Sequence, residues 1–150
     1  MTKKSGTDFD IASRCNCARL RRAARMVTRF YDQCLAPAGI GANQLTILGY
    51  LKHRGPLRMQ ALAELLAMDR ATISHNLKPL ERDGYVSITV DPADQRARLV
   101  SITKTGLAKV AEARPHWDLA QSRFESAFGP TESARLRHML DHVAEQSLAA

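Results

Sequence analysis

The sequence predicts a mainly α-helical protein with one small β-hairpin, in a chain of 150 residues. Three observations support this fold class. The two ends of the chain carry apolar residues at helical spacing, and the middle carries two short helical segments separated by a tight break. An alternating segment, a polar turn and a second alternating segment then follow. This order is that of a winged helix-turn-helix, with the hairpin as its wing and further helices on both flanks.

The composition restricts the classes of protein. The chain contains 22 Lys and Arg against 15 Asp and Glu, for a formal charge of +7, and 45% of its residues are hydrophobic. This balance favours a polyanionic partner without identifying which one, and the length suits one domain with a sizeable core. No segment has the apolar length of a membrane span, and the start lacks the pattern of a secretory signal. We therefore expect a cytoplasmic protein with no membrane partner.

The first quarter of the chain predicts a tail and one long helix. Residues 1–7 are polar, and we expect them to lack fixed structure. Residues 8–36 contain no Gly or Pro and carry apolar residues at helical spacing, which predicts one amphipathic helix. Residues 37–41 end it. Asn43 is the predicted cap of a second helix, which Gly55-Pro56 ends.

The two short helices in the middle of the chain have the make-up of a helix-turn-helix. Residues 60–66 form the first helix, and Ala67 and Met68 form the break. Asp69 is expected to cap the second helix by accepting a hydrogen bond from a backbone amide, and Gly84 is expected to end it. Apolar residues at i, i+4 and i+7 form its buried stripe, namely Ile73, Leu77 and Leu80.

The polar residues of the second helix and of the hairpin are the candidate DNA contacts. The predicted hairpin has strands at residues 85–90 and 99–103 and a polar turn at residues 91–96, which places Arg96 and Arg98 near its tip. A short ribbon with guanidinium groups at its end suits a minor groove, although an ordinary surface hairpin remains the alternative for this segment alone. The helix candidates are side chains outside the buried stripe, namely Arg70, Thr72, Ser74, His75, Asn76, Lys78 and Arg82.

The last third of the chain predicts two further helices. The first covers residues 105–128, and Pro115 is expected to kink it near Arg114. Gly129 and Pro130 open the last helix as its cap and first residue, and apolar residues line one side of it, namely Leu136, Leu140, Val143 and Leu148. Helices on both flanks exceed what DNA binding needs, so we expect them to bury their apolar faces in a homodimer. The predicted division is 1–36, 37–104 and 105–150, with dimerisation at both ends and DNA binding between them.

Several motifs in this order support a family resemblance. They are Leu62-Ala63, residues 69–74, residues 77–84, residues 91–96, and residues 102–106. Together they resemble the MarR family of dimeric winged helix-turn-helix transcriptional regulators, over about residues 15–144. One departure is that Arg58 and Met59 stand where such chains often have a Ser or Thr helix cap.

The resemblance implies a function. It implies that residues 70–82 enter the major groove of double-stranded DNA, that Asp94 and Arg96 shape and insert the wing, and that a homodimer binds a pseudo-palindromic operator. It also implies repression that a small aromatic or phenolic acid relieves, binding beside the long first helix. The candidate ligand residues are Arg21, Met26, Phe30, Leu48 and Trp117, with plain core or surface as the alternative for each.

A thiol switch is the second hypothesis for regulation. Three cysteines, Cys15, Cys17 and Cys34, do not make a disulfide framework. By resemblance to the peroxide-sensing branch of the family, Cys17 stands at the reactive position and Tyr31 at that of an accompanying tyrosine. An inert core cysteine is the alternative.

Other chemistry has little support in the sequence. His138 and His142 have a spacing that can hold zinc, but no third ligand is evident, so we expect no metal or other cofactor. No phosphate-binding loop or catalytic triad is recognisable, so an enzyme is the weakest class. A winged helix that binds protein would not explain why both the second helix and the wing are basic.

Overall fold

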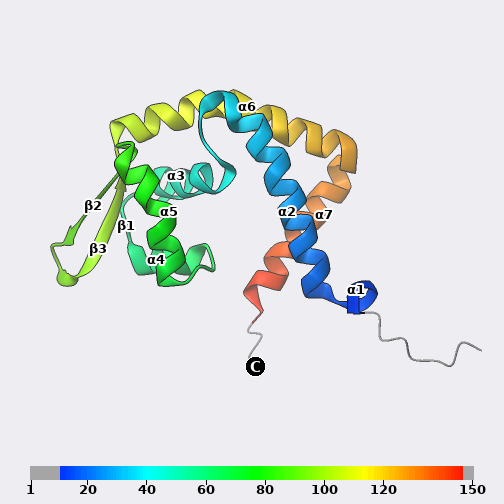
Figure 1. The fold of residues 1–150 in the computed structure, drawn as a ribbon, viewed down its shortest axis with the longest axis horizontal. Coiled ribbons are helices and arrows are strands. Elements are labelled where there is room, and N and C mark those ends of the chain that lie inside the picture. The colour runs from blue at the N-terminus through cyan, green and yellow to red at the C-terminus, as the bar shows by residue number, and fades with distance from the viewer. Residues whose placement is uncertain (1–10, 147–150) are drawn as a thin grey trace, which may run out of the picture.

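The computed structural model describes residues 11–146, and the predictions for residues 1–7 and Leu148 lie outside this range. Figure 1 shows the fold, which is mainly helical with one small sheet, as predicted. The elements in chain order are α1 (Ile11–Arg14), α2 (Asn16–Leu35), the short 3-10 helix η1 (Ala36–Ala38), α3 (Ala42–Arg54), β1 (Leu57–Arg58), α4 (Met59–Leu65), α5 (Arg70–Arg82), β2 (Val86–Asp91), β3 (Asp94–Ile102), α6 (Lys104–Phe128) and α7 (Pro130–Glu145).

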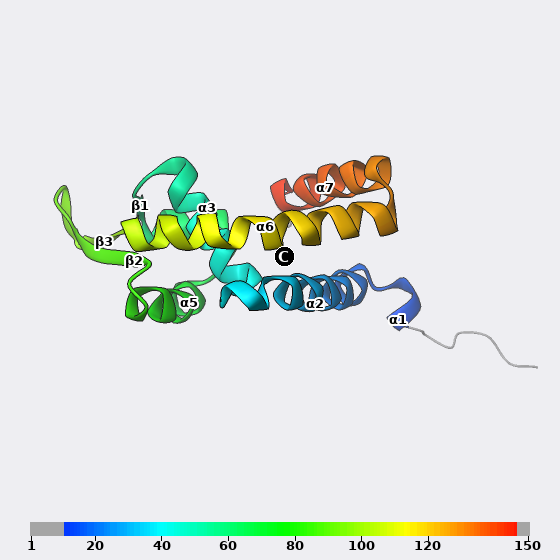
Figure 2. The ribbon, with the colours of Figure 1, turned by 90° about the horizontal axis from the view of Figure 1, so that it is seen from above.

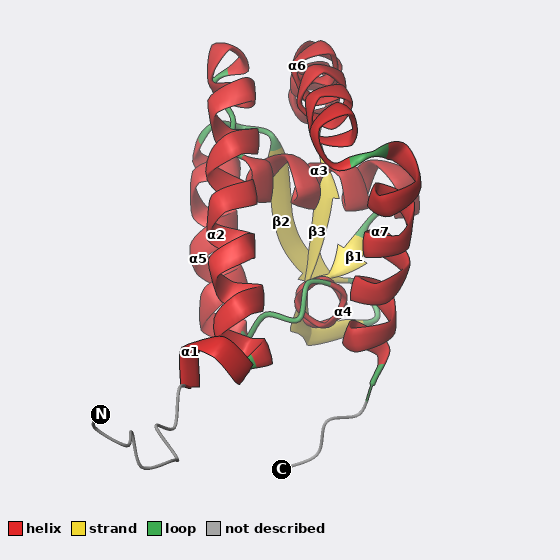
Figure 3. Cartoon of the chain, turned by 90° about the vertical axis from the view of Figure 1, so that its right-hand side faces the viewer, coloured by secondary structure: helices red, strands yellow, loops and turns green. Residues whose placement is uncertain are grey.

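Helix α6 connects two parts of the molecule. At its N-terminal end lies the winged lobe, which we define as α3 to β3, residues 42–102 (Figure 1). Near its C-terminal half, α2 and α7 lie on opposite sides of it (Figure 2), and they extend away from it in the same direction (Figure 3). We call α1, α2, α6 and α7 the helical arm. The wing and the far end of the arm therefore lie at opposite ends of the molecule.

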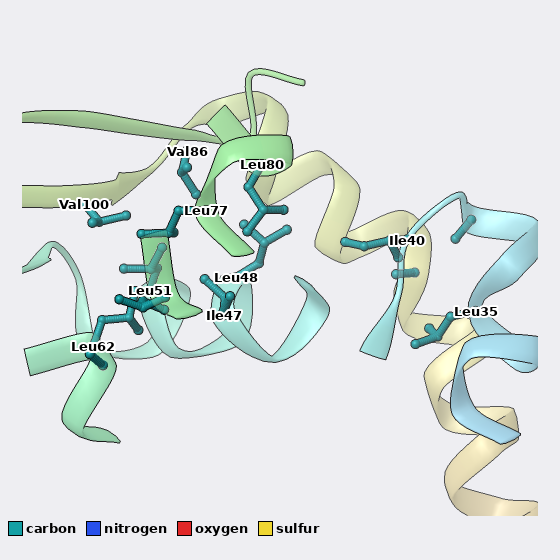
Figure 4. Packing of buried hydrophobic residues seen from close by; sticks show 14 residues of the cluster. Leu35, Ile40, Ile47, Leu48, Leu51, Leu62, Leu77, Leu80, Val86 and Val100 are labelled. Atoms are coloured by element: carbon teal, nitrogen blue, oxygen red, sulfur yellow. The ribbon is translucent and has the colours of Figure 1, made fainter. Parts of the chain in front are cut away.

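The hydrophobic core lies mainly in the winged lobe. The predicted stripe of α5 is buried there as expected, and it packs with Leu48, Leu51 and Leu62 of α3 and α4 (Figure 4). The core extends to Leu35 at the end of α2 and to Ala113 of α6. Burial of these apolar side chains is the main source of stability in the lobe.

The wing belongs to a three-stranded antiparallel sheet with strand order β1-β3-β2. The short strand β1 was not predicted; it pairs Leu57 with Val100 and Arg58 with Leu99. The predicted turn at residues 91–96 is too long, because β3 already begins at Asp94 and only Pro92 and Ala93 lie between the strands. An irregularity in the register between Val90 and Asp91 accommodates this tight turn.

Several predicted helix ends are confirmed. The amide of Thr72 donates to Asp69 Oδ1 over 2.7 Å, so Asp69 caps α5 as expected, and this hydrogen bond lowers the pKa of its carboxyl group. Gly84 follows α5 with a φ of 74°, which favours glycine. Gly129 caps α7 and Pro130 is its first residue.

Two predicted helix starts need correction. The long first helix is broken at Cys15, whose extended backbone separates α1 from α2 and whose Sγ accepts a hydrogen bond from Ala18 N. The cap of α3 is Gly41 rather than Asn43, because Gly41 N donates to the side chain of Gln44, and Asp32 accepts from the next amide. In both cases side chains close to the helix start decide its position.

Helix α6 continues through Pro115 as one helix of 25 residues, so the proline does not interrupt it. Proline removes one backbone hydrogen bond, but α6 packs against α2 and α3 along its length, and these contacts support the helix. Its first turn lies against the lobe: a Cβ added at Gly106 would lie 2.1 Å from Tyr85 O, closer than any real contact. Only glycine permits this approach.

Candidate nucleic-acid interface

Helix α5 presents a polar face on the side opposite its buried stripe. At 100° per residue, Ala71, His75, Lys78 and Arg82 lie roughly opposite Ile73 and its apolar neighbours, and all four are exposed. Ala71 is small, so it leaves room for a surface to approach this face closely. The face is therefore basic, exposed and supported by a rigid core.

A concave surface lies between α5 and the wing, and we call it the arginine cleft. Its cavity of about 270 Å³ is lined by Arg70 at the start of α5, by Asp94, Arg96 and Arg98 of β3, and by Arg58 at the end of β1. Four guanidinium groups from three elements thus surround one acidic side chain. This excess of positive charge suits an anionic partner.

A second concave surface, the α5 groove, lies between α5 and the start of α3. It is lined by Gln44, His75, Asn76, Lys78, Pro79 and Arg82. The side chain of Asn76 donates to Thr72 O over 2.8 Å, and Arg82 pairs with Asp83 at 3.0 Å. Both cations of this groove, Lys78 and Arg82, are exposed to solvent.

Local hydrogen bonds hold the wing turn. Asp94 Oδ1 accepts from Arg96 N over 3.0 Å, and Arg98 donates to Gln95 O over 3.3 Å. At the base of the turn, Arg58 Nε donates to Asp91 Oδ2 over 2.6 Å. Hydrogen bonds from Ala93 N and from Arg58 lower the pKa of the Asp91 carboxyl group, which keeps it ionised.

The structure divides the predicted DNA contacts into two groups. Arg70, Asp94, Arg96 and Arg98 line the arginine cleft, and His75, Asn76, Lys78 and Arg82 line the α5 groove. Thr72 is exposed, and Ser74 is half-buried. Among the polar lining residues, Arg58, Gln60 and Gln44 were not predicted as DNA contacts. Arg58 could have been suspected as a cation directly before the helix-turn-helix, whereas the position of Gln44 depends on how α3 packs against α5.

A third cavity, of about 380 Å³, lies between the arm and the lobe and has a mainly apolar lining. The Arg114 guanidinium lies over the Trp117 ring, 5.6 Å from its centroid, and Arg114 Nε also pairs with Asp118 Oδ1 at 2.8 Å. Tyr31 OH donates to Gln121 Oε1 over 2.7 Å, and burial followed by the charge of Glu125 raises its pKa. The lining residues are Tyr31, Leu35, Ala42, Leu45, Thr46, Gly49, Val110, Arg114 and Trp117.

The predicted ligand residues do not form one pocket in this chain. Only Trp117 lines the third cavity, whereas Leu48 is fully buried in the lobe core. Arg21 and Met26 are exposed on α2, and Phe30 packs edge-on against Tyr31. The helical spacing of α2 placed these residues on one element, but it could not show which of them faces the lobe.

The residues of the thiol hypothesis also lie apart. Cys17 is exposed in the first turn of α2, and Tyr31 lies fourteen positions further along the same helix, about 21 Å away at 1.5 Å per residue. Cys15 is the cap of α2 rather than a residue within that helix.

Residues 11–146 contain no candidate metal site and no candidate membrane span. No group of three or more His, Cys, Asp or Glu side chains in this range could hold a metal ion. Within the same range, no helix combines the length and apolar character that crossing a membrane requires.

The fold and the basic surface are those of a winged helix-turn-helix suited to binding DNA. The MarR family model matches residues 38–97. The transcriptional activatory protein BadR of Rhodopseudomonas palustris is 29% identical over 115 residues, which are 74% of this chain but only 62% of BadR. The chain thus resembles DNA-binding transcriptional regulators of the MarR type.

Solved structures agree with this assignment. The Mycobacterium tuberculosis regulator MosR in complex with DNA is 29% identical, with a TM-score of 0.77 over 87% of this chain and 94% of MosR. BpsR of Bordetella bronchiseptica, whose DNA binding is regulated by 6-hydroxynicotinic acid, is 25% identical, with a TM-score of 0.78 over 95% of this chain and 100% of BpsR.

Proposed function

We propose that the chain acts as a homodimer on a pseudo-palindromic operator, with α5 in the major groove and the wing in the adjacent minor groove. The observation that carries the proposal is the concentration of basic side chains on both surfaces of α5, in the α5 groove and in the arginine cleft. A helix fits the major groove, and guanidinium groups such as those of Arg96 and Arg98 suit a narrow minor groove. The winged lobe then binds DNA, and the flanking helices hold the dimer.

Exposed apolar side chains on the helical arm support the dimer. They occur on α1, α2, α6 and α7, and they need a partner surface to leave water. A second copy provides that surface with two-fold symmetry, which matches a two-fold operator. The exposed residues away from the lobe and from the third cavity are Ile11, Leu20, Met26, Val27, Leu119, Phe128, Met139, Leu140 and Val143.

The third cavity supports a small aromatic or phenolic acid as the effector. Its size falls in the usual range for ligand sites, and the rings of Tyr31 and Trp117 can enclose an aromatic ring. Arg114 can exchange its pairing with Asp118 for a ligand carboxylate. The cavity lies between α2, α3 and α6, so a bound ligand would change how the lobe sits on the arm. In this proposal the protein represses by occupancy, and the ligand releases it.

Binding to DNA is tested by selection from a random duplex pool, followed by fluorescence anisotropy with the recovered duplex. We expect a site with two-fold symmetry and an affinity that falls on the order of tenfold or more between about 50 and 200 mM salt. Binding that does not depend on salt, or a selected site without symmetry, would contradict the proposal. A reporter gene downstream of the selected site distinguishes repression from activation.

The effector class is tested by thermal melting with a panel of aromatic and phenolic acids. A ligand at a hundred times its dissociation constant adds about 2.7 kcal/mol of stability, which a melting curve resolves easily. The same acid should then lower operator affinity. The effector proposal fails if no acid in the panel shifts the melting temperature.

The exposure of Cys17 supports a second candidate, a thiol-based repressor. An accessible thiol in the first turn of a helix can react with a peroxide, whereas a buried one cannot. Tyr31 of the same protomer does not assist it, because this side chain lies further along α2 and donates to Gln121. If Cys17→Ser leaves the peroxide response of operator binding unchanged, this candidate is eliminated.

A further inference from the structure

Resting on the proposed DNA-binding function, we propose that the arginine cleft binds one backbone phosphate of the operator and that Arg58 completes this phosphate site. The cleft lies between the start of α5 and the wing, so DNA that engages both elements must carry its backbone across it. The chemistry recognised is a phosphodiester, and the contact is independent of base sequence.

Arg58 is held at the junction between β1 and the wing. It is the cap residue of α4, but its side chain makes no capping hydrogen bond. Instead, its Nε donates to Asp91 Oδ2, reaching from β1 past β3 to the end of β2. The guanidinium is therefore held in place over the sheet, at the point where β1 ends and the wing continues as two strands.

Arg58 keeps hydrogen-bond donors that Asp91 does not use. Nε is occupied by Asp91, while the two terminal amino groups form no hydrogen bond with residues 11–146. About half of the Arg58 side chain is exposed, against a tenth of that of Asp91. An arginine anchored in this way by a largely buried carboxylate presents a fixed pair of donors, and this geometry matches two phosphate oxygens.

The arginine cleft carries more positive than negative charge. Asp94 is the acidic side chain that lines it, and its Oδ1 already accepts from Arg96 N. Asp91 offsets only Arg58, so the charges of Arg70, Arg96 and Arg98 exceed the remaining negative charge. A phosphodiester carries the opposite sign and relieves the repulsion among these cations. A bound phosphate therefore supplies the negative charge that the cleft lacks.

The direct test replaces single phosphates of the selected duplex by neutral methylphosphonates, one position at a time. With the unmodified protein, we expect affinity to fall at several positions. With Arg58→Ala, the loss at one position in each half-site should disappear, because the cation that read this phosphate is gone. Arg123→Ala is the matched control, since Arg123 is exposed on α6 away from the wing. If no position depends on Arg58, the inference is wrong.

A salt series separates phosphate binding from a purely structural role. Arg58→Ala should reduce the slope of log affinity against log salt by about 1 for each protomer bound. Asp91→Asn breaks the same ion pair but keeps the cation, so it should weaken binding without reducing the slope. If both variants lose affinity equally with unchanged slopes, Arg58 only supports the wing and the inference is overturned.

Arg58→Lys completes the series. It keeps the charge, so the slope should return to that of the unmodified protein. An ammonium lacks the planar fork by which the guanidinium pairs with Asp91 on one side and with two phosphate oxygens on the other, so affinity should return only in part. Circular-dichroism melting of every variant verifies folding. If the unmodified protein shows no salt-dependent DNA binding at all, the proposed function fails; if it binds but Arg58→Ala keeps its slope, only this inference fails.

Discussion

The winged lobe and the helical arm differ in how completely one chain buries their apolar side chains. The lobe has a closed core, in which Ile47, Leu48, Leu51, Leu62 and Leu80 are fully buried. In the arm, α2 spans 20 residues but buries fully only Leu35 among its described side chains, and α7 exposes Met139, Leu140 and Val143 to solvent. The lobe is therefore complete within one protomer, whereas the arm exposes the surface that we propose as the dimer interface.

Leu48→Ala gives the largest expected effect, because it tests whether the lobe core stands by itself. Removing a fully buried leucine should destabilise the protein by about 2–5 kcal/mol in chemical denaturation at fixed protein concentration. Val90→Ala, at an exposed position of β2 in the same lobe, is the control and should change the free energy of unfolding much less. If Leu48→Ala instead weakens ligand binding at unchanged stability, Leu48 belongs to the ligand site and not to the core.

Charges on α7 test whether the arm is an interface. Met139 and Val143 are one turn apart and exposed, so the double substitution Met139→Glu with Val143→Glu should leave the lobe folded but shift the protein to monomers in sedimentation velocity. Operator affinity should fall on the order of a hundredfold, because two linked lobes bind more tightly than one. His138→Glu adds charge on another part of the same helix and serves as control. A stable dimer in the double variant would place the interface elsewhere.

The boundary between lobe and arm is tested through the third cavity. Arg114→Gln should weaken binding of an aromatic acid by roughly tenfold, since a charge-assisted hydrogen bond to the carboxylate is lost. Arg21→Gln, on the exposed face of α2, should have no such effect in isothermal titration calorimetry. The reverse order of effects would restore the ligand site predicted from the sequence and reject the cavity.

Acid sensitivity of the wing is the smallest expected effect. The pKa of Asp91 is lowered in the folded state, so its contribution to stability is full above the usual value of 3.8 and is lost as pH falls through the lowered folded pKa. Protection factors of the amides in β2 and β3, which correct for the intrinsic pH dependence of exchange, should therefore fall on acidification from pH 5 to about pH 3. Asp91→Asn should remove most of this pH dependence, and an unchanged profile in that variant would assign it to other carboxyl groups.

The sequence alone predicted the elements whose causes are local. The apolar spacing of α5, its Asp69 cap and the glycine after it depend on residues within one helix, and all three are confirmed. The Gly129 and Pro130 start of α7 has the same origin. The order of these motifs also predicted the resemblance to the MarR family, because a linear motif is read without knowledge of packing.

Tertiary structure decided every feature that joins distant parts of the chain. It showed that β1 pairs with β3, that α6 continues through Pro115, and that Leu48 lies in the core while Arg114 faces a cavity. It also brought Arg58 to Asp91, 33 positions away. Helical periodicity gives the face of an element but not its neighbour, and a side chain's role depends on that neighbour. The sequence thus determined which helices and turns form, and packing decided which side chains meet.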